Sequence, residues 1–147
     1  MPPERTVTEA WLQAAEADFS VLPILEQAKK WPHGCYFACM SVEKFGKYLL
    51  LAQGESIDLV KQMRHKLGAI WERVETLYGG SVQLTDLLNE LTRIPEYGNE
   101  SQGQFSYRYP AGKRIPSDFL DEPKFRTHHR IATDARDLAL ALSESAI

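Results

Sequence analysis

The chain has 147 residues, of which 44% are hydrophobic and 25% are charged, and its formal net charge is −3. This length suits one hydrophobic core, and this composition excludes a disordered or fibrous protein. The acidic balance also excludes a protein that coats nucleic acid with its whole surface, so any phosphate binding must be local. Without a secretory signal or an apolar run of bilayer length, we expect a cytoplasmic protein with no membrane partner.

The first predicted helix begins at a capping box. Thr6 and Glu9 have the S/T-x-x-E spacing, in which each side chain accepts a hydrogen bond from the other residue's backbone. Apolar residues then recur at helical spacing as far as Leu25. Pro23 interrupts this pattern, which predicts either a kink near residues 19–23 or two shorter helices.

The second predicted helix, over residues 34–53, is apolar almost all round and should be the buried centre of the fold. Residues 31–34 before it read as a turn. Its strongly polar residues are Glu43, Lys44 and Lys47. Buried charges need partners, and neighbouring helices, a second subunit or a ligand could supply them.

The remaining chain predicts further helices and one long connection. Residues 56–77 carry a single apolar seam, and residues 81–94 form another helix that Pro95 ends. Periodicity is lost over residues 96–126, and the last helix begins at Thr127 or Asp134. The expected fold is all-α: an up-and-down bundle of four to five helices with a long ordered loop before the last helix.

Several motifs follow one another in an informative order. They are Trp11-x2-Ala14-x3-Asp18, Cys35-Tyr36-Phe37-Ala38-Cys39 leading into Glu43-Lys44 and Leu49-Leu50, His65-x-Leu67, and Arg108-Tyr109-Pro110. Together they resemble the HEPN family, named for a nucleotide-binding domain of higher eukaryotes and prokaryotes. The resemblance covers essentially the whole chain and implies a single HEPN-like domain over residues 1–147. It also implies a homodimer, a role around nucleotides or RNA, and a nucleotidyltransferase partner of the toxin-antitoxin kind.

Ribonuclease members of this family carry an Arg, four to six residues, and then a His. No histidine of this chain has an arginine at that distance upstream. An arginine that holds the scissile phosphate and a histidine that moves protons are therefore not paired at one helix end. The sequence favours a non-catalytic member.

Basic residues concentrate late in the chain. Residues 108–130 hold six basic and three acidic residues, with aromatic residues between them. Such a segment could hold phosphates on its cations and stack bases on its rings. The predicted phosphate ligands here are Arg108, Tyr109, Lys113, Arg114 and Arg126. The alternative is that these cations pair with acidic helices.

A second candidate pocket involves the charged residues of the central helix. Glu43 and Lys44 could line a nucleotide cleft together with Arg64 and His65, and His65 could act as an acid or base. The alternative is that Glu43 and Lys47 form an ordinary ion pair one turn apart, and that His65 is a packing residue.

No metal or other cofactor is expected. His128 and His129 are adjacent and point in different directions, and the thiols of Cys35 and Cys39 should be buried in a helix. Three functions remain open. The leading one is a module that binds a nucleotide, an RNA phosphate or a partner protein. The second is a metal-independent ribonuclease that uses Arg108 or Arg126 with His128 or His129. The third is an adaptor that binds only protein.

Overall fold

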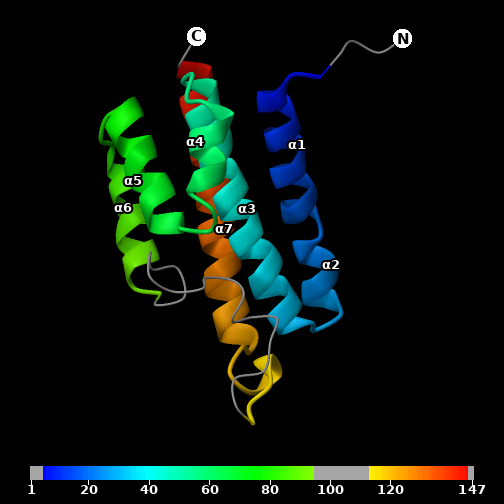
Figure 1. Cartoon of the computed structure of the whole chain (residues 1–147). Coiled ribbons are helices and arrows are strands. Elements are labelled where there is room, and N and C mark those ends of the chain that lie inside the picture. Colours follow the sequence, from blue (N-terminus) through cyan, green and yellow to red (C-terminus); the bar gives the residue numbers. More distant parts are fainter. Residues whose placement is uncertain (1–4, 95–112, 146–147) are drawn as a thin grey trace.

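The structure is a computed structural model that describes residues 5–94 and 113–145. These residues form helices and no strand, as predicted (Figure 1). In chain order the elements are α1 (Val7–Ser20), α2 (Leu22–Gln27), α3 (Trp31–Ala52), α4 (Ile57–Gln62), α5 (Leu67–Tyr78), α6 (Val82–Thr92), the 3-10 turn η3 (Pro116–Asp118) and α7 (Glu122–Ser145). Most of the predicted long loop, residues 95–112, lies outside the described residues.

The first two helices confirm the capping box and the interruption. The backbone N–H of Glu9 donates to Thr6 Oγ1 over 3.1 Å, and that of Thr6 donates to Glu9 Oε2 over 3.3 Å. The helix ends at Ser20, and α2 places Pro23 in its first turn. The backbone N–H that a proline lacks has no helical partner in a first turn, so Pro23 is tolerated there. The chain therefore forms two short helices and not one kinked helix.

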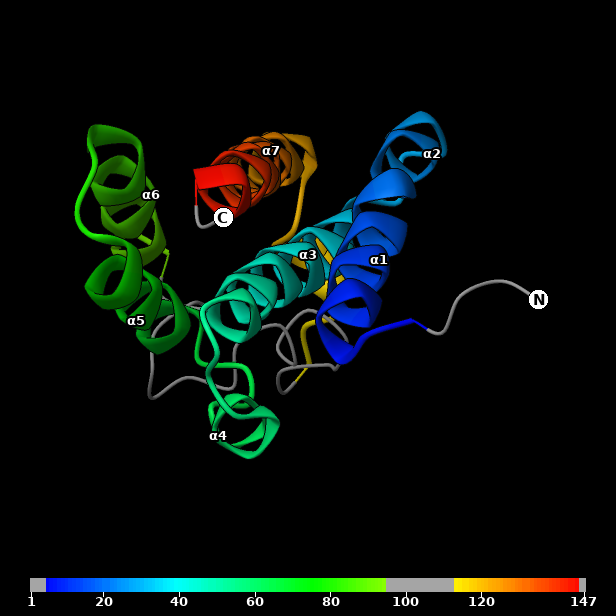
Figure 2. The same cartoon turned by 90° about the horizontal axis from the view of Figure 1, so that it is seen from above.

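Helix α3 is the centre of the bundle, as predicted. It packs against α1, α2, α4, α5 and α7, and Figure 2 shows it between α1 and α5. Its start differs from the prediction, because residues 31–34 are its first turn and not a connecting turn. Gly34 serves a close helix contact: a Cβ atom there would lie 2.3 Å from Cδ2 of Phe125 on α7. Gly34 therefore allows α3 and α7 to pack closely. Pro32 is tolerated because it lies in the first turn of the helix.

The predicted continuous helix over residues 56–77 is wrong. The chain leaves α4 after Gln62, passes through Arg64 with a φ of 50°, and re-enters a helix at Leu67. A left-handed residue cannot continue a right-handed helix. Val60 before the break and Leu67 after it are both fully buried. The turn therefore lets both halves of the apolar seam reach the core.

The last helix begins earlier than predicted, at Glu122 instead of Thr127 or Asp134. The Asp121 side chain accepts a hydrogen bond from the Lys124 backbone N–H over 3.1 Å, which caps the helix start. Pro123 lies in this first turn, where it is tolerated. The resulting 24-residue helix runs beside α3 in the same direction (Figure 1).

The core lies where α3 meets its neighbours. Cys35 and Cys39 are fully buried, as expected, and Phe45, Trp71 and Phe125 are among the largest fully buried side chains. Over the described part of the chain, no helix combines the length and apolar character needed to cross a bilayer.

Candidate functional site

A carboxylate, an ammonium group and an imidazole meet beside the middle of α3. Lys47 Nζ donates to Glu43 Oε2 over 3.2 Å, and His65 Nδ1 lies 2.6 Å from Glu43 Oε1. The Glu43 and Lys47 side chains are each 5% exposed, whereas the His65 side chain is 36% exposed. The buried carboxylate thus ties the turn between α4 and α5 to the central helix.

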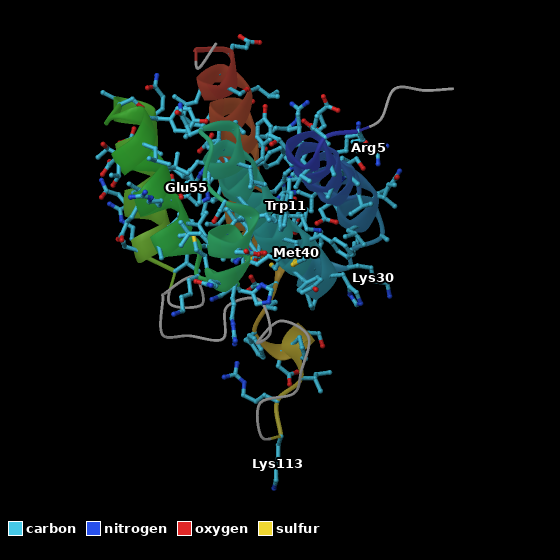
Figure 3. All side chains as sticks on the ribbon, turned by 45° about the horizontal axis from the view of Figure 1, so that its top comes forward. Arg5, Trp11, Lys30, Met40, Glu55 and Lys113 are labelled. Atoms are coloured by element: carbon cyan, nitrogen blue, oxygen red, sulfur yellow. The ribbon has the colours of Figure 1, made fainter. Side chains whose placement is uncertain are left out.

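The lysines of α3 also reach α1. Lys47 Nζ lies 5.4 Å from the centre of the Trp11 ring, a cation–π contact, and Lys44 forms an ion pair with Asp18. Figure 3 shows Trp11 on α1, beside the central helix. Neighbouring helices therefore supply partners for the charges of α3.

The structure brings together part of the predicted pocket around Glu43. Glu43 and His65 are in contact, whereas Lys44 faces Asp18. Arg64 is exposed in the turn that carries His65. Whether these four residues bind a ligand stays a prediction.

A groove of about 340 Å³ lies between α2 and the first half of α7. It is lined by Glu26, Arg126, His129, Arg130 and Thr133. Arg126 and Arg130 are one helical turn apart, and their side chains are 61% and 59% exposed. This groove places two guanidinium groups and an imidazole on one surface.

Both arginines have acidic neighbours. Arg126 donates to Glu122 over 2.7 Å and lies 3.6 Å from Glu26, and Arg130 donates to Glu90 over 3.2 Å. Ion pairs at such exposed positions contribute only about 0–1 kcal/mol each. A phosphate, which accepts two parallel hydrogen bonds from one guanidinium, can therefore compete with these carboxylates.

The two adjacent histidines of α7 have different environments. His128 is 3% exposed, and its Nδ1 lies 2.7 Å from the Lys124 carbonyl oxygen. A carbonyl oxygen only accepts, so this Nδ1 carries a proton. The His129 ring contacts the rings of Phe19 and Phe125, with centroid distances of 5.9 and 5.5 Å. It also lines the groove that contains Arg126 and Arg130, which we call the arginine groove.

Of the other predicted phosphate ligands, Lys113 and Arg114 do not line the arginine groove, and the remaining two lie outside the described residues. The Arg114 guanidinium carbon is 5.1 Å from the centre of the Phe119 ring. Figure 3 shows Lys113 at the tip of its segment, pointing away from the helices. Arg108 and Tyr109 lie outside the described residues.

Sequence reasoning did not select Arg130, Thr133 or Glu26 as members of a site. The spacing of Arg126 and Arg130 contains the missing signal, because residues four apart on a helix share one face. A helix that begins at Thr127 or later, as the sequence predicts, leaves Arg126 in a loop, where it shares no helical face with Arg130. The contribution of Glu26 from α2 depends on tertiary packing, for which the sequence has no local signal.

The described residues contain no cluster of three or more His, Cys, Asp or Glu side chains that could hold a metal ion. Their geometry defines an all-helical module with a buried ionic cluster on its central helix and an arginine groove beside its last helix. The family model for the HEPN domain matches residues 8–102, and the chain belongs to this family. The match includes α1 to α6, and α7 follows it. Comparison with curated proteins and with solved structures gave no match.

Proposed function

We propose that the protein is a non-catalytic HEPN module that binds a nucleotide or an RNA phosphate in the groove between α2 and α7. The HEPN family is associated with nucleotide binding and with ribonucleases, which supports a phosphate-bearing ligand. The observation that carries the proposal is the pair of exposed arginines, Arg126 and Arg130, that line a single groove.

The chemistry of the groove suits a phosphate group. Each guanidinium offers a planar fork of donors that matches two phosphate oxygens. The groove has a volume of about 340 Å³ and is open to solvent, so a phosphate can reach both guanidinium groups. The ring of His129 offers either a further donor or a surface for a base to stack on, whereas the Thr133 hydroxyl already donates to the His129 carbonyl oxygen over 2.9 Å.

The other predicted ligands extend this proposal. Arg108, Tyr109, Lys113 and Arg114 precede α7 in the chain and would contact parts of an RNA beyond the phosphate in the groove. The cluster of Glu43, Lys44, Arg64 and His65 is proposed as a separate polar surface for the same class of ligand.

A binding titration tests the groove. Fluorescently labelled ATP and a short single-stranded RNA are titrated with the wild type and with an Arg126→Gln/Arg130→Gln variant. We expect at least about tenfold weaker binding in the variant, because each lost charged hydrogen bond contributes about 1.5 kcal/mol or more. Circular dichroism checks that the variant remains helical.

The matched control removes two arginines elsewhere. Arg5 precedes α1 and Arg73 lies on α5, so an Arg5→Gln/Arg73→Gln variant changes the net charge equally without touching the groove. Equal weakening in both double variants would indicate attraction by overall charge and would contradict the proposal. Failure of the wild type to bind either ligand would also contradict it.

A ribonuclease is the second candidate function, and the position of His129 favours it. His129 shares the groove with Arg126 and Arg130, so a proton-transferring group lies beside phosphate ligands. Incubation of labelled RNA with the protein in EDTA separates the two functions. Cleavage that His129→Ala abolishes would support the ribonuclease, whereas intact RNA with retained binding supports the non-catalytic module.

We further propose that the protein forms a homodimer and pairs with a nucleotidyltransferase, as in toxin-antitoxin systems. Many HEPN domains are dimeric, which supports the homodimer. Sedimentation velocity of the pure protein tests the dimer. A monomer at all concentrations, combined with no binding of nucleotide or RNA, would leave the protein-only adaptor as the remaining function.

A further inference from the structure

A second groove, of about 480 Å³, runs between α6 and the C-terminal half of α7. Its floor is apolar: Leu87 of α6 and Leu138 of α7 form an almost fully buried base, and Ala141 and Leu142 of α7, which are exposed and half-buried, present the accessible apolar surface. Residues 134–142 of α7 span about 12 Å at the helical rise, which matches about two turns of a partner helix.

Both rims of this groove are acidic. Asp86 lies on the α6 side, and Asp134 and Asp137 lie on the α7 side; all three are exposed. No basic side chain lines the groove among the described residues. The groove therefore combines an apolar floor with negative charge on both sides.

Like charges crowd the α7 rim. Partial burial of the carboxylate, together with the nearby carboxylates of Glu90 and Asp137, raises the pKa of Asp134, although Arg130 partly opposes this effect. One oxygen of Glu90 accepts from Arg130, and the other is buried without a hydrogen-bond partner in the described part of the chain. Within the described part of the chain, the only cation that pairs with the carboxylates of this rim is Arg130, which donates to Glu90.

The groove continues beyond the start of α6. An adjoining hollow shares Ser81 and Asp86 with it and is also lined by Val82, whose side chain is 75% exposed. An apolar side chain this exposed beside an apolar floor extends the surface available for contact.

We propose that the groove between α6 and α7 docks a basic amphipathic helix of a partner protein. Its apolar face rests on the leucine floor, and its Lys or Arg side chains reach the aspartate rims. This is the geometry in which helices are recognised by apolar grooves. A second copy of the chain suits the groove less well, because the chain has a net charge of −3 and two copies meeting here would oppose like charges. The proposal is independent of phosphate binding in the arginine groove.

The test uses the full chain and a defined probe. A fluorescein-labelled helical peptide with leucines on one face and lysines on the other is titrated by anisotropy against the wild type and an Asp134→Asn/Asp137→Asn variant. We expect the variant to bind about tenfold more weakly, since it loses two charge contacts beside an apolar surface. The matched control is Glu72→Gln/Glu75→Gln on α5, which changes the net charge equally and should bind within about twofold of the wild type.

Further probes separate the apolar and ionic contributions. A peptide with serines in place of the leucines keeps the charge and should lose binding, and a peptide with glutamates in place of the lysines should not bind. Undiminished binding of the serine peptide would overturn the proposal, as would equal weakening by the α5 control or no binding by the wild type. A dimer of the wild type that the leucine–lysine peptide dissociates would place a second copy in the groove and overturn it as well.

Discussion

The Glu43 carboxylate lies 2.6 Å from Nδ1 of His65, although 22 residues separate them in the chain. Next to it, the backbone carbonyl of Val42 accepts a hydrogen bond from Nε1 of Trp71 over 3.1 Å. Two consecutive residues of α3 therefore hold the region where α4 ends and α5 begins. The left-handed residue Arg64 directly precedes His65 in the turn that these contacts hold against α3.

Replacing Glu43 should strongly destabilise the protein. A Glu43→Gln change preserves size but leaves the ammonium group of Lys47, whose side chain is 5% exposed, without its anionic neighbour. Breaking a buried ion pair from one side typically costs about 3–5 kcal/mol. We expect a loss near the lower end of this range, measured as the free energy of unfolding in urea at neutral pH.

The control for this prediction is Glu55→Gln, which removes the partner of Arg73. The Arg73 side chain is 43% exposed, so its charge remains solvated when the carboxylate is lost. The Glu55→Gln change should therefore lower the free energy of unfolding by only about 0–1 kcal/mol. If both variants lost the same free energy of unfolding, the burial of Glu43 with Lys47 and His65 would not matter for stability.

The helices that were predicted correctly have strong local signals. The capping box at Thr6 and the apolar character of α3 are properties of neighbouring residues, and both appear in the structure as expected. The incorrect predictions concern where helices begin and end, which depends on packing between residues far apart in the chain. The apolar seam over residues 56–77 continues through the break because Val60 and Leu67 both reach the core, so periodicity alone could not reveal the turn.

The same distinction applies to the candidate site. The sequence identified Glu43 and Lys44 as charges in need of partners, but those partners, His65 and Asp18, come from other elements. The basic surroundings of Arg126 predict a phosphate ligand, whereas its relation to Arg130 depends on where α7 begins. Local patterns thus indicated which residues are unusual, and the tertiary arrangement determined what they contact.

The close approach of α5 to α3 depends on Gly46. A Cβ atom there would lie 2.6 Å from Cγ2 of Ile70 and 3.0 Å from Nε1 of Trp71. Overpacking of this kind typically costs about 1–3 kcal/mol, and the gain in helix propensity from glycine to alanine is about 1 kcal/mol. We therefore expect Gly46→Ala to lower the free energy of unfolding, because the overpacking cost exceeds the gain in propensity. Urea unfolding measures this change. The control is Gly80→Ala, where, among the described residues, no atom beyond the two chain neighbours lies within 4 Å of the added carbon; stability should be unchanged or slightly higher. A Gly46→Ala protein as stable as the wild type would contradict the packing argument.

Binding of single-stranded RNA in the arginine groove should depend on salt in a defined way. Each phosphate neutralised by a cation contributes about 0.7 to the slope of log affinity against log salt concentration. Removing Arg126 and Arg130 together should therefore reduce this slope by about 1.4. Titrations at several salt concentrations measure the slope. If affinity falls while the slope stays constant, the arginines do not contact phosphates directly.

The stability contributed by Tyr78 should depend on pH in the alkaline range. Its hydroxyl donates to the Leu49 carbonyl oxygen over 2.8 Å, and burial, together with nearby Tyr48, raises its pKa from 10.0 to about 12. Unfolding exposes the hydroxyl and lowers the pKa, so the folded state binds the proton more tightly than the unfolded state does. This stabilisation is fully present below pH 10 and is lost as the pH rises toward about 12.

The comparison that isolates this effect uses a Tyr78→Phe variant. The free energies of unfolding of the two proteins are measured in urea at a series of pH values. The advantage of the wild type should be constant below pH 10 and should shrink above it, because phenylalanine has no proton to lose. The tyrosinate absorbance of the folded wild type should also contain one late-titrating component that the variant lacks. A stability difference that does not change with pH would mean that the Tyr78 hydroxyl titrates equally in both states, and the burial argument would then be wrong.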